Sequence, residues 1–143
     1  MGFSAEAVDR DTSGMDWAID EAGIHVLRCD LENEPWPYSH DEFAGIVVVR
    51  YLHRPLFANF VASLAPGGVL IYETFALGQE RFGRPSNPDF LLQPGELLEV
   101  ARGKLHVVAF EQGMEKSPDQ ALLQRICAVR LPAPSAVFPL TGE

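Results

Sequence analysis

The chain has 143 residues, of which eleven are basic and twenty acidic, so its formal net charge is −9. Repulsion between this charge and phosphate argues against DNA or RNA as a partner, and against binding to anionic lipid. The length suits one compact domain, and no apolar run reaches the roughly 20 residues that a membrane span needs. Because no signal-peptide pattern is evident, we expect a cytoplasmic protein.

The residue types that commonly bind metals or form cross-links are scattered along the chain. Cys29 and Cys127 lie far apart, each inside an apolar run, which predicts two free thiols and no disulfide. No CxxC pair occurs, and no ligand spacing connects the four histidines, which are His25, His40, His53 and His106. The sequence therefore predicts no metal site.

The amino-terminal part alternates between strand-like and helix-like segments. Residues 4–9 predict a short strand, weakened by its alanines. A helix is expected to begin at a cap provided by Thr12 or Ser13 and to run to about Ala22. Residues 24–29 predict a second strand. Alternation of this kind is typical of a parallel sheet with crossover helices.

The clearest element is the β-branched run at residues 45–52, which predicts a strand buried on both faces. Pro55 suits the first turn of a helix that reaches Leu64, with apolar residues at helical spacing. The Ala-Pro-Gly-Gly segment at 65–68 then ends the helix and leads into a strand at 69–74. These segments together predict a βαβ unit.

The carboxyl-terminal part predicts one more helix and a hairpin. A long connection at 75–93, rich in Gly and Pro, is expected to be either functional or disordered. A short helix follows at 94–103. Strands at 105–111 and 125–131 are expected to pair antiparallel at the edge of the sheet. The remaining residues, 132–143, predict a loose Pro-rich tail.

Four segments resemble class I S-adenosylmethionine-dependent methyltransferases, and they follow one another along the chain in the order expected for that family. Residues 65–70 (APGGVL) resemble the segment that leads into strand five of that family. Residues 7–11 resemble the acidic end of strand two, and residues 29–32 the segment after strand three. Residues 72–75 together with 82–88 resemble a subgroup near the tellurite-resistance and ubiquinone-biosynthesis methyltransferase-like proteins.

The resemblance implies an α/β fold over residues 1–131, with a Rossmann-like, mostly parallel sheet, crossover helices and an antiparallel C-terminal edge hairpin. The chain departs from the family in having no G-x-G loop, since its only Gly-Gly pair is Gly67-Gly68. It starts where strand two is expected, so we interpret the fold as truncated at the N-terminus. Loss of the central strand is expected either to expose apolar edges or to bring residues 4–9 and 45–52 together.

The resemblance also implies a cofactor site at the carboxyl ends of the strands. Asp9 is expected to accept hydrogen bonds from ribose hydroxyls. Asp30 is expected to accept from the adenine amine, while Leu31 donates its backbone N–H. Arg50 and Tyr51 close the buried strand at 45–52 and complete the predicted cofactor set. The alternative for Asp9 is a solvated turn carboxylate or a helix cap, and the alternative for Asp30 is a loop aspartate.

Glu73, Arg84 and Asn87 are the predicted substrate-binding residues. Glu73 ends the strand next to Arg50, and a general-base role competes with a salt-bridging role. Arg84 and Asn87 are expected either to clamp a polar acceptor from a lid or, for Asn87, to tie the loop locally. No catalytic residue is named, because methyl transfer depends mainly on alignment of the two reactants.

Three functional hypotheses follow. In the first, the chain binds S-adenosylmethionine and methylates a small molecule. In the second, it is a degenerate, non-catalytic domain that serves as a dimerising assembly or regulatory module. In the third, a partner chain or a second copy supplies the missing strand edge, and this is compatible with the second. A homodimer is therefore expected.

Overall fold

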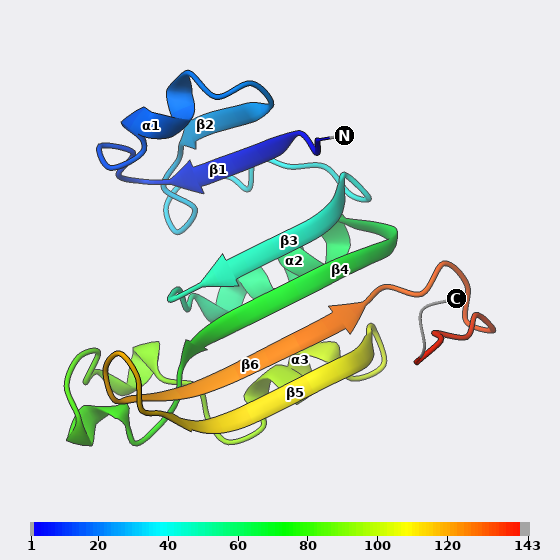
Figure 1. Ribbon diagram of the computed structural model, residues 1–143. Helices are drawn as coiled ribbons and strands as arrows, with labels where there is room; N and C mark the ends of the chain where they lie inside the picture. Colours follow the sequence, from blue (N-terminus) through cyan, green and yellow to red (C-terminus); the bar gives the residue numbers. More distant parts are fainter. Residues whose placement is uncertain (1, 141–143) are drawn as a thin grey trace. The chain divides into compact units, whose positions relative to one another are not determined.

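The computed structural model describes residues 2–140, which form two compact units that divide after Pro37. The first unit contains β1 (Ala5–Asp9), α1 (Asp16–Ile19) and β2 (Ile24–Arg28). The two strands pair in parallel, with Ala5 opposite Ile24 and Asp9 opposite Arg28 (Figure 1). Both strands predicted for this part of the sequence are confirmed.

The helix predicted between Thr12 or Ser13 and Ala22 is wrong in length and in its cap. Only the four residues of α1 are helical, and the N-cap is Met15, whose side chain makes no capping bond. Oδ1 of Asp11 instead accepts a hydrogen bond from the Ser13 backbone N–H at 3.0 Å. This local bond holds residues 11–13 in a turn, in competition with the helix.

The second unit, which begins at Tyr38, is a four-stranded sheet with helices. Its elements are β3 (Phe43–Val49), the 3-10 helix η1 (Arg54–Leu56), α2 (Phe57–Ser63), β4 (Leu64–Phe75), η2 (Gln79–Arg81), η3 (Pro88–Phe90), α3 (Glu96–Ala101), β5 (His106–Glu115) and β6 (Ala121–Val129). The strand order is β3-β4-β6-β5, and β3 and β4 are parallel. The predicted βαβ unit and the antiparallel β5–β6 hairpin are therefore confirmed, with β5 on the outside.

The Ala-Pro-Gly-Gly segment does not separate helix from strand as predicted, because it lies inside β4. Gly67 has a φ of 83°, a left-handed conformation that glycine adopts without strain. A Cβ on Gly68 would lie 2.7 Å from the Ala65 carbonyl oxygen and 2.9 Å from that of Phe43. Gly67 thus supplies the left-handed conformation, and Gly68 lets the start of β4 pass close to the Phe43 backbone.

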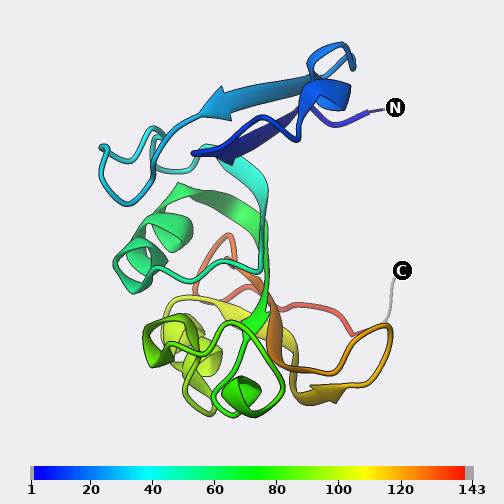
Figure 2. The same cartoon turned by 90° about the vertical axis from the view of Figure 1, so that its left-hand side faces the viewer.

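One face of the four-stranded sheet forms the core of this unit. Figure 2 shows α2 and α3 on the same side of that sheet. Tyr72, which is fully buried on this face, packs edge-on against Phe57 and Phe60 of α2. Its hydroxyl donates to the Tyr51 carbonyl oxygen at 2.7 Å, and burial raises the pKa of the phenol. Strand-to-helix packing of this kind explains the alternating burial along β4.

The opposite side of the same sheet, here called the open face, carries exposed apolar side chains. Val47 and Val49 of β3 are 66% and 55% exposed, and Ile71 of β4 is 47% exposed. The strand register places Cys127 of β6 next to Ile71 on this face. Parallel strands are normally covered on both faces, so the open face is unusual.

Both cysteines are free, as predicted. Burial, together with the nearby charges of Glu34 and Asp30, raises the pKa of the Cys29 thiol. The predicted loose tail is packed in one place, since the Phe138 ring stacks on His106 with 5.6 Å between the ring centroids. Residues 141–143 of that predicted tail lie outside the described residues. None of the helices described here has the length and apolar content of a membrane span.

Candidate functional site

The first group of candidate residues lies at the carboxyl ends of β1 and β2. Because the strands are parallel, Asp9 and Asp30 come to the same edge of their sheet, and the Cys29 N–H donates to the Asp9 carbonyl oxygen at 3.0 Å. Oδ1 of the exposed Asp9 accepts from the Asp11 N–H at 3.0 Å. Within the described part of the chain, Oδ2 of Asp9 accepts no hydrogen bond. The structure thus brings together the two predicted aspartates.

Asp30 organises a tight turn directly after β2. Its Oδ1 accepts from the Glu32 N–H at 3.1 Å, and its Oδ2 accepts from Nδ2 of Asn33 at 2.8 Å. The hydrogen bond from Asn33 has the larger effect and that from Glu32 the next, and both hold the pKa of the Asp30 carboxyl below its ordinary value. The group is therefore ionised at neutral pH. The backbone N–H of Leu31 donates to no group among residues 2–140. An anionic acceptor and an available donor therefore stand side by side.

A second group lies in the other unit, at the carboxyl ends of β3 and β4. Arg50 directly follows β3, has a φ of 55°, and donates its backbone N–H to the Glu73 carbonyl oxygen at 2.9 Å. Its guanidinium lies 4.4 Å from the centroid of the Phe75 ring and 3.7 Å from Oε1 of Glu73. Tyr51 turns its carbonyl oxygen to the buried hydroxyl of Tyr72. Three predicted residues, Arg50, Tyr51 and Glu73, thus lie close together.

The left-handed conformation of Arg50 gives a direct test of the geometry at the end of β3. A residue with a Cβ at this φ costs about 1 kcal/mol relative to glycine. We therefore expect Arg50→Gly to be more stable than Arg50→Ala by about 1 kcal/mol, because both variants lose the same guanidinium contacts. Urea denaturation measures the difference. An alanine variant as stable as the glycine variant would contradict this backbone assignment.

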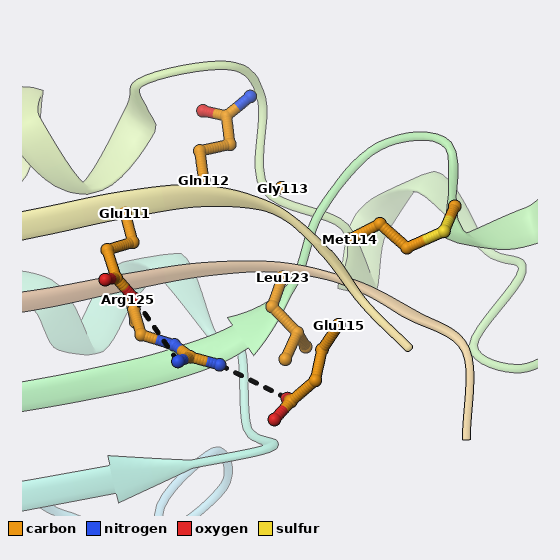
Figure 3. A pocket seen from close by; sticks show the side chains of 7 residues that line it. All are labelled: Glu111, Gln112, Gly113, Met114, Glu115, Leu123 and Arg125. Carbon is orange, nitrogen blue, oxygen red and sulfur yellow. Dashed lines mark hydrogen bonds and ion pairs between the residues drawn. The ribbon is translucent and has the colours of Figure 1, made fainter. Parts of the chain in front are cut away.

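Glu73 belongs to a network of ion pairs on the open face. Arg125 of β6 approaches Oε2 of Glu73 at 3.0 Å, and it also pairs with Glu111 at 3.3 Å and Glu115 at 3.2 Å. Figure 3 shows the arginine reaching toward Glu111 and Glu115 beside a shallow pocket of about 340 Å³. The Glu73 carboxylate is thus shared by two guanidinium groups, the salt-bridging role weighed above. The sequence did not single out Arg125, because only the strand register brings it next to Glu73.

The predicted lid residues lie in the connection between β4 and α3, which is ordered. Leu91 and Leu92 of this segment are fully buried. Asn87 caps η3, since its Oδ1 accepts from the Asp89 N–H at 3.0 Å, which is the local tie considered for this residue. Arg84 is exposed, and its carbonyl oxygen accepts from Nε2 of the buried Gln79 at 3.3 Å. The alternative of a disordered connection is therefore wrong.

Arg54 fastens this connection to the rest of the unit. Its guanidinium bonds both carboxylate oxygens of Glu96, at 2.8 and 3.0 Å, and the carbonyl oxygens of Asp89 and Leu91, each at 2.9 Å. Only the planar, five-donor guanidinium can satisfy all four acceptors. The sequence offered no signal for this role.

We expect Arg54→Ala to lower the free energy of unfolding by about 2 kcal/mol, because carbonyl and carboxylate acceptors lose a charged donor. Arg102→Ala is the matched control, since among residues 2–140 the Arg102 side chain pairs with the exposed Glu99 alone. It should cost about 0.5 kcal/mol or less. Chemical denaturation of both variants checks the prediction, and equal losses would show that the anchor is not structural.

Among the described residues, no three His, Cys, Asp or Glu side chains are grouped closely enough to hold a metal ion. The two candidate groups offer hydrogen-bond acceptors, hydrogen-bond donors and ion pairs. At the ends of β1 and β2 this chemistry suits a neutral or cationic ligand rich in donors. At the ends of β3 and β4, the Glu73 carboxylate lies between the guanidinium groups of Arg50 and Arg125.

Comparison with known proteins gives matches only at the level of structure. No protein-family model matches the chain, and a search of curated proteins finds no match. Among solved structures, the N-methyltransferase NodS from Bradyrhizobium japonicum WM9 matches with a TM-score of 0.65 and 17% identity, over 88% of this chain and 72% of NodS. The structural match thus covers most of the chain, whereas the sequence identity is low.

Two further structures carry the same fold. The 1,6-didemethyltoxoflavin-N1-methyltransferase of Burkholderia thailandensis, solved with 1,6-didemethyltoxoflavin and S-adenosylhomocysteine, has a TM-score of 0.61 and 14% identity over 90% of this chain and 61% of its own. A 16S rRNA (adenine(1408)-N(1))-methyltransferase from Catenulisporales acidiphilia has a TM-score of 0.57 and 12% identity, over 90% of this chain and 73% of its own. The chain therefore has the Rossmann-like α/β fold of S-adenosylmethionine-dependent methyltransferases.

Proposed function

We propose that the chain binds S-adenosylmethionine through the carboxyl ends of β1 and β2 and takes part in methyl transfer to a small molecule. The observation that carries the proposal is the placement of Asp9 and Asp30 at one edge of two parallel strands. Ligands of open α/β sheets bind at this edge. The fold match to methyltransferases supports the choice of ligand, although a fold by itself fixes no function.

The groups available at this edge fit an adenosine. Oδ2 of Asp9 is an open acceptor for ribose hydroxyls, which are donors. The ionised Asp30 has lone pairs left for the adenine amine after it accepts from Glu32 and Asn33. The backbone N–H of Leu31 can donate to a ring nitrogen. These are the roles that the family resemblance gives to the three residues.

The remaining candidates lie in the second unit, and their roles stay predictions that the family resemblance implies. Arg50 and Tyr51, which follow β3, are predicted for the cofactor. Glu73, the exposed Arg84 guanidinium and the amide of Asn87 are proposed for the acceptor. The cofactor supplies the electrophilic methyl group, and the residues bind and align the two reactants.

The small-molecule assignment depends on charge. Residues up to Pro37 contain nine acidic and two basic residues, a net charge of −7 around the proposed adenosine site. This charge attracts the cationic sulfonium of S-adenosylmethionine and repels a phosphate backbone. Because the fold is shared with an rRNA methyltransferase, charge and not fold is the argument against a nucleic acid.

A second candidate, a non-catalytic module without cofactor, is favoured by one observation. The sequence contains no G-x-G motif, the loop that lets a backbone approach the polar end of the cofactor in the family it resembles. The cofactor-binding protein and the non-catalytic module differ in a single measurable property, affinity for the cofactor. Three finer assignments also remain predictions: the subgroup near the tellurite-resistance proteins, the truncation and the homodimer.

Isothermal titration with S-adenosylhomocysteine distinguishes the two. The proposal predicts a saturable heat and a rise in melting temperature, and adenosine alone should bind the same site more weakly. Binding should tighten with S-adenosylmethionine at low ionic strength, since its sulfonium adds a positive charge. No heat and no thermal shift at millimolar ligand would leave the non-catalytic module as the function.

A further inference from the structure

The backbone of Asp30 is held at both of its polar groups by the turn that follows β2. Its carbonyl oxygen accepts from the Glu34 N–H at 2.8 Å and from the Asn33 N–H at 3.2 Å. Its own N–H donates to Oε2 of Glu34 at 2.5 Å. Glu34 therefore bonds to Asp30 twice, once through its backbone and once through its carboxylate.

The two peptide groups beside the Asp30 Cα determine where the candidate adenine contacts point. In a trans peptide group the C=O and the N–H point in opposite directions, and Asp30 and Leu31 are joined by a trans bond. Because the Asp30 carbonyl oxygen points into the turn, the Leu31 N–H points out of it. Glu34 fixes the other peptide group, through the Asp30 N–H. With both groups fixed, the Asp30 side chain leaves the backbone in one direction.

The Glu34 carboxylate also lies against the end of β2. Burial first, and next the charge of Glu34, raise the pKa of the Cys29 thiol. Cys29 donates its N–H to the Asp9 carbonyl oxygen at 3.0 Å, which joins this end of β2 to β1. All of these contacts lie among residues 9–34, inside the first unit. The supports of the turn are therefore supplied by the unit that carries it.

We propose that Glu34 is a positioning residue for the adenine ring, acting through the Asp30 N–H and not on the ligand itself. Its carboxylate holds the Asp30 side chain and the Leu31 N–H in the orientation in which an acceptor and a donor meet one ring edge. This inference rests on the proposed function, since the ligand is the adenosine proposed there. A turn that is ordered before the ligand arrives lowers the entropy cost of binding.

Two variants that lose the same charge separate this role from a general effect of charge. Glu34→Gln keeps a side-chain oxygen that can accept from the Asp30 N–H, whereas Glu34→Ala keeps none. In isothermal titration with S-adenosylhomocysteine we expect Glu34→Ala to raise Kd about tenfold and Glu34→Gln about threefold or less. Wild-type affinity in Glu34→Ala would overturn the proposal. Equal losses in the two variants would also overturn it, because charge alone would then explain them.

The wild type, titrated in the same way, distinguishes this inference from the proposed function. A wild type that binds no S-adenosylhomocysteine would overturn the proposed function and the role of Glu34 with it. A wild type that binds, beside a Glu34→Ala variant that binds equally well, would overturn the role of Glu34 alone and leave the proposed function standing.

Amide hydrogen exchange of the ligand-free protein, followed by NMR, tests the hydrogen bond itself. Exchange at the Asp30 amide should speed up at least about tenfold in Glu34→Ala and stay within about threefold of the wild type in Glu34→Gln. The Cys29 amide should keep its protection in both variants, because its acceptor is the Asp9 backbone. An unchanged Asp30 amide in Glu34→Ala would contradict the proposal. Loss of protection at Cys29 as well would show that Glu34 supports the strand pair as a whole, which would also contradict it.

Discussion

Replacing Gln124 with alanine is expected to lower the free energy of unfolding by about 4 kcal/mol. The Gln124 side chain is completely buried in β6. Its Oε1 accepts from the Leu97 N–H at 2.7 Å, and its Nε2 donates to the Gln93 carbonyl oxygen at 2.9 Å and to Oε1 of Gln112 at 3.1 Å. Alanine would leave the Leu97 N–H buried without an acceptor, beside a cavity.

Urea denaturation of the variant measures this loss, with Gln120→Ala as the matched control. Gln120 is exposed next to the same strand, and its replacement should change the stability by about 0.5 kcal/mol or less. The large effect of Gln124→Ala is expected because the Leu97 N–H in the first turn of α3 is buried and bonds to the Gln124 side chain. A loss below about 1 kcal/mol would mean that another group satisfies the Leu97 N–H.

Replacing Asp30 with alanine is expected to weaken S-adenosylhomocysteine binding by at least tenfold. The variant removes the carboxylate proposed to accept from the adenine amine, and it releases the turn that presents the Leu31 N–H. Asp9→Ala should weaken binding as well, because the ribose hydroxyls lose the carboxylate proposed to accept their hydrogen bonds. Isothermal titration measures each affinity.

Asp20→Ala is the control for this experiment, since it removes the same charge from an exposed position in the same unit. Its affinity should stay within about twofold of the wild type, because charge alone acts weakly through solvent. If Asp20→Ala and Asp30→Ala weakened binding equally, the effect would be one of net charge. If Asp30→Ala bound as tightly as the wild type, the adenosine site would be misplaced.

The strands could be predicted because their patterns are strong and local. The apolar segment that forms β2 fell where expected. The β-branched run forms β3 at Phe43–Val49, earlier than the predicted residues 45–52, and the predicted burial on both faces is wrong, because Val47 and Val49 are exposed. The short helix α1 was overestimated, since the turn made by Asp11 and Ser13 competes with it. The extension of β4 through Pro66 and two glycines depends on long-range pairing with β3, which no local pattern reveals.

The candidate site could be predicted in part for a similar reason. Parallel pairing brings strand ends to one edge, so Asp9 and Asp30 meet there once the strands are recognised. The network around Arg125 needs the antiparallel register of β6, and the Arg54 anchor spans more than thirty residues. Contacts of this length depend on tertiary packing, and the spacing of residue types along the chain carries no trace of them.

The central claim is that an adenosine binds at the carboxyl ends of β1 and β2, and amide NMR spectra of the ¹⁵N-labelled chain titrated with S-adenosylhomocysteine test it most directly. The account predicts saturable shifts that are largest at the amides of Asp9, Asp30 and Leu31, with the Leu31 amide moving downfield as it gains an acceptor. Spectra without shifts, or shifts confined to other segments such as η2 and η3, would contradict it.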